Sequence, residues 1–267
     1  MSRTPTFFIP HGGGPCFFMD WTMGPRDTWD NMAAWLKAVP QAVGPKPDAI
    51  VVISAHWEEP EFTVTTSAQP PLLFDYYGFP DYTYKLTYPA PVAHDLGTKV
   101  RKLLSDAGIE SGEDTQRDYD HGIFVPLKVA FPDADIPILQ LSLQQNLDPA
   151  FHVKVGKALA PLREQNIPII GSGLSFHNLR ALGDPRVNAP AAAWDQWLTH
   201  TLCEETPEER ERDIINWEKA PGARISHAEE EHLLPLMIAV GAAENDPGHH
   251  VYSGTIWGKA VSAYHFG

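Results

Sequence analysis

The sequence has very few cysteines: Cys16 and Cys203 are the only two among 267 residues, and they lie far apart. A framework of disulfide bonds is therefore not expected, and this scarcity favours a reducing setting. The N-terminus also has no apolar segment followed by a small-residue cleavage site of the kind that a signal peptide carries. The sequence thus predicts a cytoplasmic protein.

Long apolar runs and an excess of positive charge are also absent. No apolar run approaches the ~18 residues of a membrane helix. Lys and Arg number 20 against 34 Asp and Glu, which gives a formal net charge of -14. Binding to nucleic acid or to an anionic membrane relies on Lys and Arg, so we expect neither as a partner. An acidic ligand is not excluded, because a basic pocket can lie inside an acidic protein.

Proline, by contrast, is abundant. The chain has 25 prolines, about twice the usual share of ~5%. They are scattered rather than clustered, which indicates rigid, ordered loops. The sequence contains no internal repeat, low-complexity tract or linker, so we expect residues 1–267 to form a single catalytic domain.

Short apolar runs alternate with helix-like segments along the first two thirds of the chain. The runs have the length and composition of strands buried on both faces, and they span residues 4–9, 49–55, 136–142 and 167–173. The helix-like segments span residues 27–39, 91–108, 122–131 (interrupted by Pro126) and 148–164. This order predicts an α/β domain with a central, largely parallel or mixed sheet flanked by helices. The remainder is expected to be mostly helical to about residue 241 and then to form a final pair of strands.

Three of the 12 histidines follow predicted strands. His11 follows the first strand and precedes three glycines, His56 follows the second strand, and His177 lies just beyond the fourth. In open α/β sheets, ligands bind beyond the carboxyl ends of the strands. We therefore expect these three side chains to share one crevice.

His121 lies beside Asp120 where a loop meets a predicted helix. A neighbouring carboxylate can raise the pKa of an imidazole and fix its tautomer, which suits an acid/base role. The alternative is that this pair caps the helix and has no chemical role. The residues alone leave both interpretations open.

His227 and His232 lie on a predicted helix, five residues apart. This spacing is about 140° around a helix at ~100° per residue, so the two cannot bind one metal if the helix is continuous. His232 precedes an apolar stretch and is expected to point inward, whereas His227 is interpreted as a surface or capping residue. We assign no chemistry to the histidines at 94, 152, 200, 249, 250 and 265.

A set of His11, His56 and His232, with no cysteine nearby, suits a metal that prefers imidazole: iron(II), zinc or, less often, copper or nickel. Carboxylates also flank two of these histidines, at residues 58–59 and 229–231. A site of two histidines and one carboxylate, typical of non-haem iron oxygenases, therefore stays open.

Five motifs occur in the order "PHGGGP", "VVISAHWE", "YDHGIFVPL", "GSGLSFHNLR" and "EEHLLPL". Together they resemble the DOPA-4,5-dioxygenase-like group of class III extradiol ring-cleaving dioxygenases, relatives of the catalytic subunit of protocatechuate 4,5-dioxygenase. The resemblance runs from about residue 5 to the C-terminus and includes "GFPDYTYKLTYPAPV" (78–92), which is similar to this group's substrate-side loop. The opening reads HGGGP where relatives often have HGSP, and "AEEE" replaces a proline-containing segment, departures that concern the substrate rather than the metal site.

The resemblance implies a single α/β domain that cleaves a catechol ring with O₂ at a mononuclear iron(II) site. By position, His11, His56 and His232 match the metal ligands. His177 matches a second-sphere acid/base, although zinc-containing members have this residue near the metal. His121 matches a substrate-side histidine.

Aromatic side chains near these motifs are candidates for the walls of a substrate pocket, namely Trp57, Phe79, Tyr82 and Tyr84. Two alternatives remain: a zinc-dependent hydrolase with the same three ligands, and a metal- or ligand-binding protein without activity. The expected partners are a small aromatic diol and O₂. The sequence leaves open the catechol, the ring bond, the native metal, and whether the protein is a monomer or a homodimer.

Overall fold

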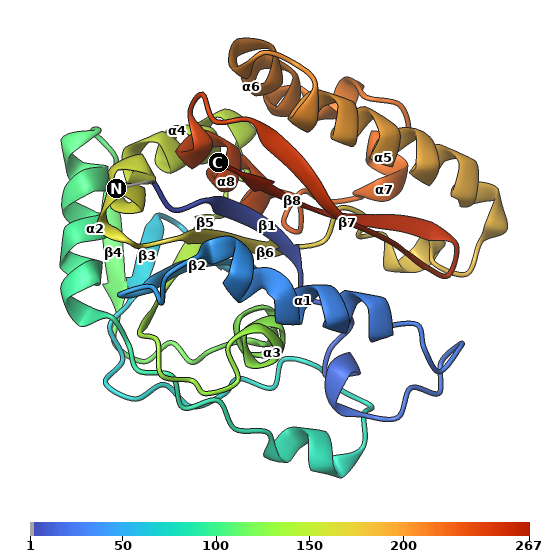
Figure 1. Ribbon diagram of the computed structural model, residues 1–267, viewed down its shortest axis with the longest axis horizontal. Helices are drawn as coiled ribbons and strands as arrows, with labels where there is room; N and C mark the ends of the chain where they lie inside the picture. The colour runs from blue at the N-terminus through green and yellow to red at the C-terminus, as the bar shows by residue number, and fades with distance from the viewer. Residues whose placement is uncertain (1–2) are drawn as a thin grey trace.

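The computed structural model describes residues 3–267, in which eight strands form one sheet in the order β4-β3-β5-β2-β6-β1-β8-β7 (Figure 1). The strands are β1 (Thr6–Pro10), β2 (Ile50–Glu59), β3 (Phe62–Thr65), β4 (Ser111–Asp114), β5 (Ile138–Gln144), β6 (Ile169–Gly173), β7 (Gly248–Ile256) and β8 (Lys259–Phe266). The helices are α1 (Asp30–Val43), α2 (His94–Asp106), α3 (His121–Ala130), α4 (Pro149–Leu159), α5 (Asn188–Cys203), α6 (Pro207–Ile215), α7 (Ala223–Ser226) and α8 (Leu234–Ala243).

The four predicted strands form the centre of the sheet. β5, β2, β6 and β1 lie side by side and are all parallel. The sheet becomes mixed toward both edges, because β3 pairs antiparallel with β5, and β8 pairs antiparallel with β1 and with β7. The predicted α/β fold and the final pair of strands are confirmed. The short strands β3 and β4 were not predicted.

Both faces of the central strands are covered by helices, as Figure 1 shows. Alternate residues point to opposite sides: Phe8 and Ile53 belong to the core cluster that includes α4 and α8. Phe7 and Val52 belong to the cluster that includes α1 and α3. This burial on two sides explains why the strands are continuously apolar. Among residues 3–267, no helix has both the length and the apolar character needed to cross a membrane.

Helix α3 continues through Pro126, although proline removes one helical hydrogen bond. The missing N–H would have bonded to the carbonyl oxygen of Gly122, four residues earlier. Ser172 of β6 donates its hydroxyl to that oxygen instead. The proline therefore frees a carbonyl that ties the first turn of α3, which begins at His121, to a central strand.

Helices α4 and α8 approach each other backbone to backbone at a pair of glycines. A Cβ atom on Gly156 of α4 would lie 2.2 Å from the carbonyl oxygen of Ile238. A Cβ atom on Gly241 of α8 would lie 2.1 Å from the carbonyl oxygen of Val153. Neither position has room for a side chain unless the helices separate.

We predict that Gly156→Ala lowers the free energy of unfolding by roughly 1–3 kcal/mol, the usual cost of overpacking a core. Urea denaturation followed by circular dichroism measures this change. Gly183→Ala is the matched control, because no atom lies within 4 Å of the added Cβ there. Equal stability of the two variants would contradict the close helix contact.

Candidate metal centre

Five histidines from separate parts of the chain line one cavity of about 410 Å³. His11 directly follows β1, His56 lies in the second half of β2, and His177 comes four residues after β6. His121 is the first residue of α3, and His232 precedes α8. The cavity therefore lies beyond the carboxyl ends of the parallel strands, where strand-end residues meet.

Three of these histidines present their Nε2 atoms to one another, because an oxygen lies beside each Nδ1. His11 Nδ1 lies 2.9 Å from the carbonyl oxygen of Gly12, and His232 Nδ1 lies 2.8 Å from Glu231 Oε1. His56 Nδ1 lies 3.6 Å from Asp75 Oδ2. The first two contacts are hydrogen bonds that require the ring proton on Nδ1, so Nε2 of His11 and of His232 keeps a free lone pair; Asp75 lies on the Nδ1 side of His56 at a longer distance.

The three side chains are close enough to bind a single ion. Their ligand atoms lie within 4.8 Å of one another, and His11 Nε2 is 3.4 Å from His56 Nε2. Two nitrogens about 2.1 Å from one ion at a tetrahedral angle lie about 3.4 Å apart. His232 Nε2 is buried and has no hydrogen-bond partner among the described residues. The donor set of His11, His56 and His232 therefore fits a divalent metal.

Burial keeps these imidazoles uncharged. Desolvation, with a smaller contribution from the neighbouring histidines, lowers the pKa of His11 and His232 well below the ordinary value. Desolvation and the nearby His121 lower the pKa of His56 to about 4, although Asp120 and Asp75 oppose this shift. Metal ligation requires neutral imidazole, so the site disfavours protons and favours a metal cation in their place.

Asp75 is a functional residue that sequence reasoning missed. Its Oδ1 accepts hydrogen bonds from His121 Nδ1 at 2.7 Å and from the backbone N–H of His121 at 3.0 Å. Burial alone would raise the pKa of Asp75, but the contacts with His121 and His56 outweigh it, so the pKa is lowered. The ionised carboxylate thus orients two rings. No motif or strand end marked this residue, because it lies in an irregular loop.

Glu231 plays the same part on the other side of the cavity. Its Oε1 lies 2.8 Å from His232 Nδ1 and 3.1 Å from His177 Nδ1. The two rings are stacked, with centroids 3.3 Å apart and planes inclined by 17°. Burial raises the pKa of Glu231, but the hydrogen bond with His177 outweighs this and lowers it. Because Oε1 already contacts both Nδ1 atoms, we assign Glu231 to orienting the histidines.

Asp120 occupies the N-cap position of α3, as the capping interpretation expected, but its side chain does not bond to the first turn of the helix. It accepts instead from Ser54 Oγ at 2.6 Å, Gln140 Nε2 at 2.8 Å and Arg117 Nη2 at 2.9 Å. These bonds join β2, β5 and the start of α3, which fixes His56 and His121 relative to each other.

The prediction for His227 was wrong. Residues 227–233 are not helical, so the five-residue spacing says nothing about which way the two histidines point. His227 is fully buried, lies against Trp194 and Trp217, and has Nε2 2.9 Å from the carbonyl oxygen of Ser175. It is a core residue. His232, as expected, points inward.

Of the four candidate aromatic residues, only Phe79 is among the residues lining the cavity. Trp57 is buried, donates its Nε1–H to Glu59, and lies under the guanidinium of Arg117. Tyr84 packs beside Phe74 and Tyr76, and Tyr82 is half exposed. We therefore keep Phe79 alone for the cavity wall.

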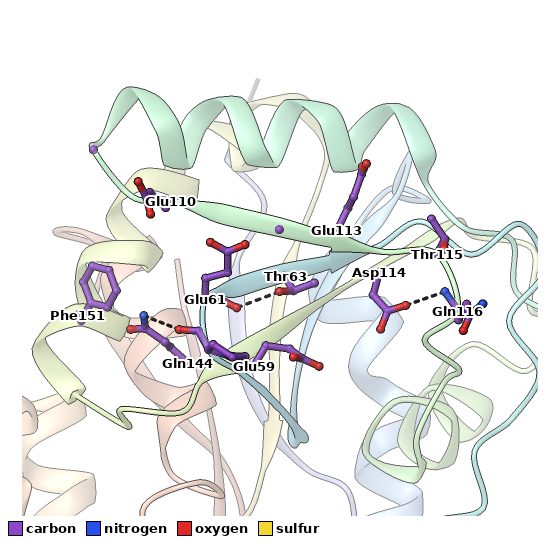
Figure 2. A pocket seen from close by; sticks show the side chains of 13 residues that line it. Glu59, Glu61, Thr63, Glu110, Glu113, Asp114, Thr115, Gln116, Gln144 and Phe151 are labelled. Atoms are coloured by element: carbon purple, nitrogen blue, oxygen red, sulfur yellow. Dashed lines mark hydrogen bonds between the residues drawn. The ribbon is translucent and has the colours of Figure 1, made fainter.

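A second hollow of about 830 Å³ lies beside β3 and β4 (Figure 2). Its lining includes Glu59, Glu61, Glu110, Glu113 and Asp114. Figure 2 shows these carboxylates spread along the strands without a common point. Among the described residues, every group of His, Cys, Asp and Glu close enough to hold a metal contains at least two histidines of the histidine cavity. That cavity is therefore the candidate site.

Comparison with known proteins identifies relatives of this chain along almost its whole length. The family model described as "Catalytic LigB subunit of aromatic ring-opening dioxygenase" matches residues 5–265. The chain is 36% identical over 266 residues to 4,5-DOPA dioxygenase extradiol of Beta vulgaris, covering 97% of this chain and 94% of the relative. It is 33% identical over 289 residues to dioxygenase tasH of Hapsidospora irregularis, covering 100% and 86%. The crystal structure of an uncharacterised Escherichia coli K12 protein matches with a TM-score of 0.77 at 28% identity, covering 99% of this chain and 100% of that one.

We predict that Glu231→Gln weakens metal binding by about 10–100-fold, the usual effect of removing a carboxylate that orients a ligand. Calorimetric titration of the metal-free protein with zinc measures the affinity. Glu229→Gln is the control, because it removes the same charge from an exposed neighbouring position. An unchanged affinity in Glu231→Gln would show that this carboxylate does not hold the ligand ring.

Proposed function

Because the chain belongs to the family of catalytic LigB subunits of aromatic ring-opening dioxygenases, we propose that the histidine cavity is where it opens a catechol ring. The protein is an extradiol dioxygenase, an enzyme that cleaves the ring beside the two hydroxyls with O₂. The observation that carries the assignment to this cavity is the convergence of three imidazoles with lowered pKa, two of them buried and one half-buried, beside which two further histidines lie.

We assign His11, His56 and His232 as ligands of a mononuclear iron(II) ion. Iron is favoured over zinc because the reaction transfers electrons to O₂, and zinc has no redox chemistry. When bound, iron(II) supplies the positive charge that favours an ionised catechol and the redox centre that O₂ chemistry needs. Three protein ligands leave positions for both reactants.

His177 is the proposed acid/base. Glu231 holds its Nδ1, so Nε2 is the nitrogen available to a substrate. There it would accept a proton from a catechol hydroxyl and later return it to an oxygen of the opened ring. The stacked ring of His232 fixes the plane of His177 and places it beside a metal ligand.

His121 is the proposed substrate-side residue. Asp75 holds its Nδ1, which leaves Nε2 to hydrogen bond with a hydroxyl of the catechol. Its ring lies 4.0 Å from that of His56 between centroids, so the two act on the same small volume. A bond from His121 would orient the diol before the ring opens.

The glycines after His11 give the substrate room. Gly12 and Gly14 have φ of +84° and +54°, values that side chains rarely adopt. A Cβ atom on Gly14 would lie 2.8 Å from the ring of Phe79. Because Gly14 has no side chain, the ring of Phe79 can pack against this loop, and the cavity beside His11 is left unfilled.

We predict that iron(II)-reconstituted protein consumes O₂ with a catechol and forms a yellow ring-opened product. His11→Ala and His56→Ala should abolish both signals, because each removes a ligand. An oxygen electrode and a spectrophotometer follow the reaction with a panel of catechols that includes DOPA, caffeate, protocatechuate and the uncharged 4-propylcatechol. His200→Ala, an exposed residue, is the control and should retain activity. Hydrolytic activity that persists without oxygen would instead indicate a zinc hydrolase.

We also predict that His177→Asn lowers kcat by about 10²–10⁴-fold, the usual contribution of an acid/base group, while iron stays bound. Single-turnover kinetics give the rate, and atomic absorption gives the iron content of the same sample. Loss of iron from this variant would make His177 a ligand. An unchanged kcat would remove it from the proton transfer.

A further inference from the structure

The cavity has two chemically different parts. Its inner end carries the five histidines and Asp75. The remaining walls are almost entirely apolar, with aromatic and aliphatic side chains that include Trp29, Phe79, Phe176, Leu182, Ile256 and Val261. At about 410 Å³, the cavity falls in the range of pockets for ligands much larger than a catechol ring. A substituent on the ring must therefore occupy the apolar part.

No lysine or arginine is among the residues that line this cavity. The nearest charges at its inner end are carboxylates: Asp75 lines the cavity, and Glu231 contacts His177. Arg117 donates Nη2 to Asp120 and to the carbonyl oxygen of His56. A carboxylate on the substrate would thus leave water without a cationic partner, which is unfavourable.

Lys259 bonds to two residues of the apolar wall, but its ammonium group has no proton left for a ligand. It is almost fully buried. Its Nζ donates to the carbonyl oxygens of Leu182, Asp184 and Trp257 at 2.8–3.2 Å. Because an ammonium has three protons, none is left for a ligand. Lys259 therefore holds two wall residues in place and does not recognise charge.

The mouth of the cavity is apolar as well. Met23, Leu179 and Trp257 line it and remain 48%, 67% and 39% exposed. Trp257 Nε1 donates to the carbonyl oxygen of Met23 at 3.0 Å, so the turn between β7 and β8 is fixed to the loop before α1. Arg180, beside Leu179, is exposed and is not a lining residue. A large apolar group gains contacts here that a charged group does not.

We infer that the substrate is a catechol bearing an uncharged, apolar substituent, such as an alkyl or aryl group, and that catechols with an anionic side chain are poor substrates. This inference rests on the proposed function of the site. The diol meets the histidines, and the substituent lies on the wall of Phe79, Phe176 and Ile256 toward the mouth.

The test compares 3-(3,4-dihydroxyphenyl)propanoate with its methyl ester and with 4-propylcatechol, which share the ring and the chain length. With iron-loaded enzyme at neutral pH, we expect kcat/KM for the ester and the alkylcatechol to exceed that of the acid by at least about tenfold. Binding is measured separately without oxygen on zinc-loaded protein, by quenching of tryptophan fluorescence, because Trp21, Trp29 and Trp257 line the cavity. The same order of affinities is expected.

A pair of variants tests the wall directly. Leu179→Arg places a cation at the exposed mouth and should reduce the preference for the ester over the acid by about fivefold or more. Ile225→Arg adds the same charge at another exposed position outside the cavity and should leave the preference unchanged. Equal binding and cleavage of acid and ester by the unmodified enzyme would overturn the inference. Tight binding of the ester without O₂ uptake from any catechol would support the wall assignment and contradict the proposed function.

Discussion

The site depends on the oxygen atoms that lie beside the Nδ1 atoms of its histidines. A histidine side chain can rotate and can carry its proton on either nitrogen, so a strand end alone does not aim it. In this protein the carbonyl oxygen of Gly12 and the carboxylates of Asp75 and Glu231 contact the Nδ1 atoms of the three proposed ligands. Their Nε2 atoms then face a common point. Because two of the rings are buried and that of His56 is half-buried, a proton is disfavoured at that point and neutral imidazole is available to a metal.

The two carboxylates have parallel roles. Asp75 contacts one proposed ligand, His56, and one histidine kept for the substrate, His121. Glu231 does the same for a ligand and for the histidine stacked on it. Each carboxylate thus fixes a proposed metal ligand relative to a histidine that we propose acts on the substrate.

The sequence predicted the residues whose positions follow from the sheet. His11 directly follows β1 and His56 lies in the second half of β2, which runs on past the predicted strand end, and continuous apolar runs identified both strands. Asp75 could not be predicted in this way, because its partner His121 is 46 residues away and only the folded loop joins them. His227 was misplaced because the argument assumed an unbroken helix, whereas α7 ends at Ser226 and α8 begins at Leu234. The strands β3 and β4 have four residues each, too few for a clear pattern.

The reaction and the choice of substrate depend on different parts of the chain. The motifs shared with ring-opening dioxygenases supply the histidines at the inner end of the cavity. The apolar part is built from residues of the loop before α1, the segment after β6, and the hairpin of β7 and β8, such as Trp29, Leu182 and Ile256. Of these, the part of that loop beyond the three glycines, which includes Trp29, and the hairpin carry no residue that we assign to the metal or to a proton. They can therefore change without affecting ring opening, so relatives that share the reaction need not share the substrate.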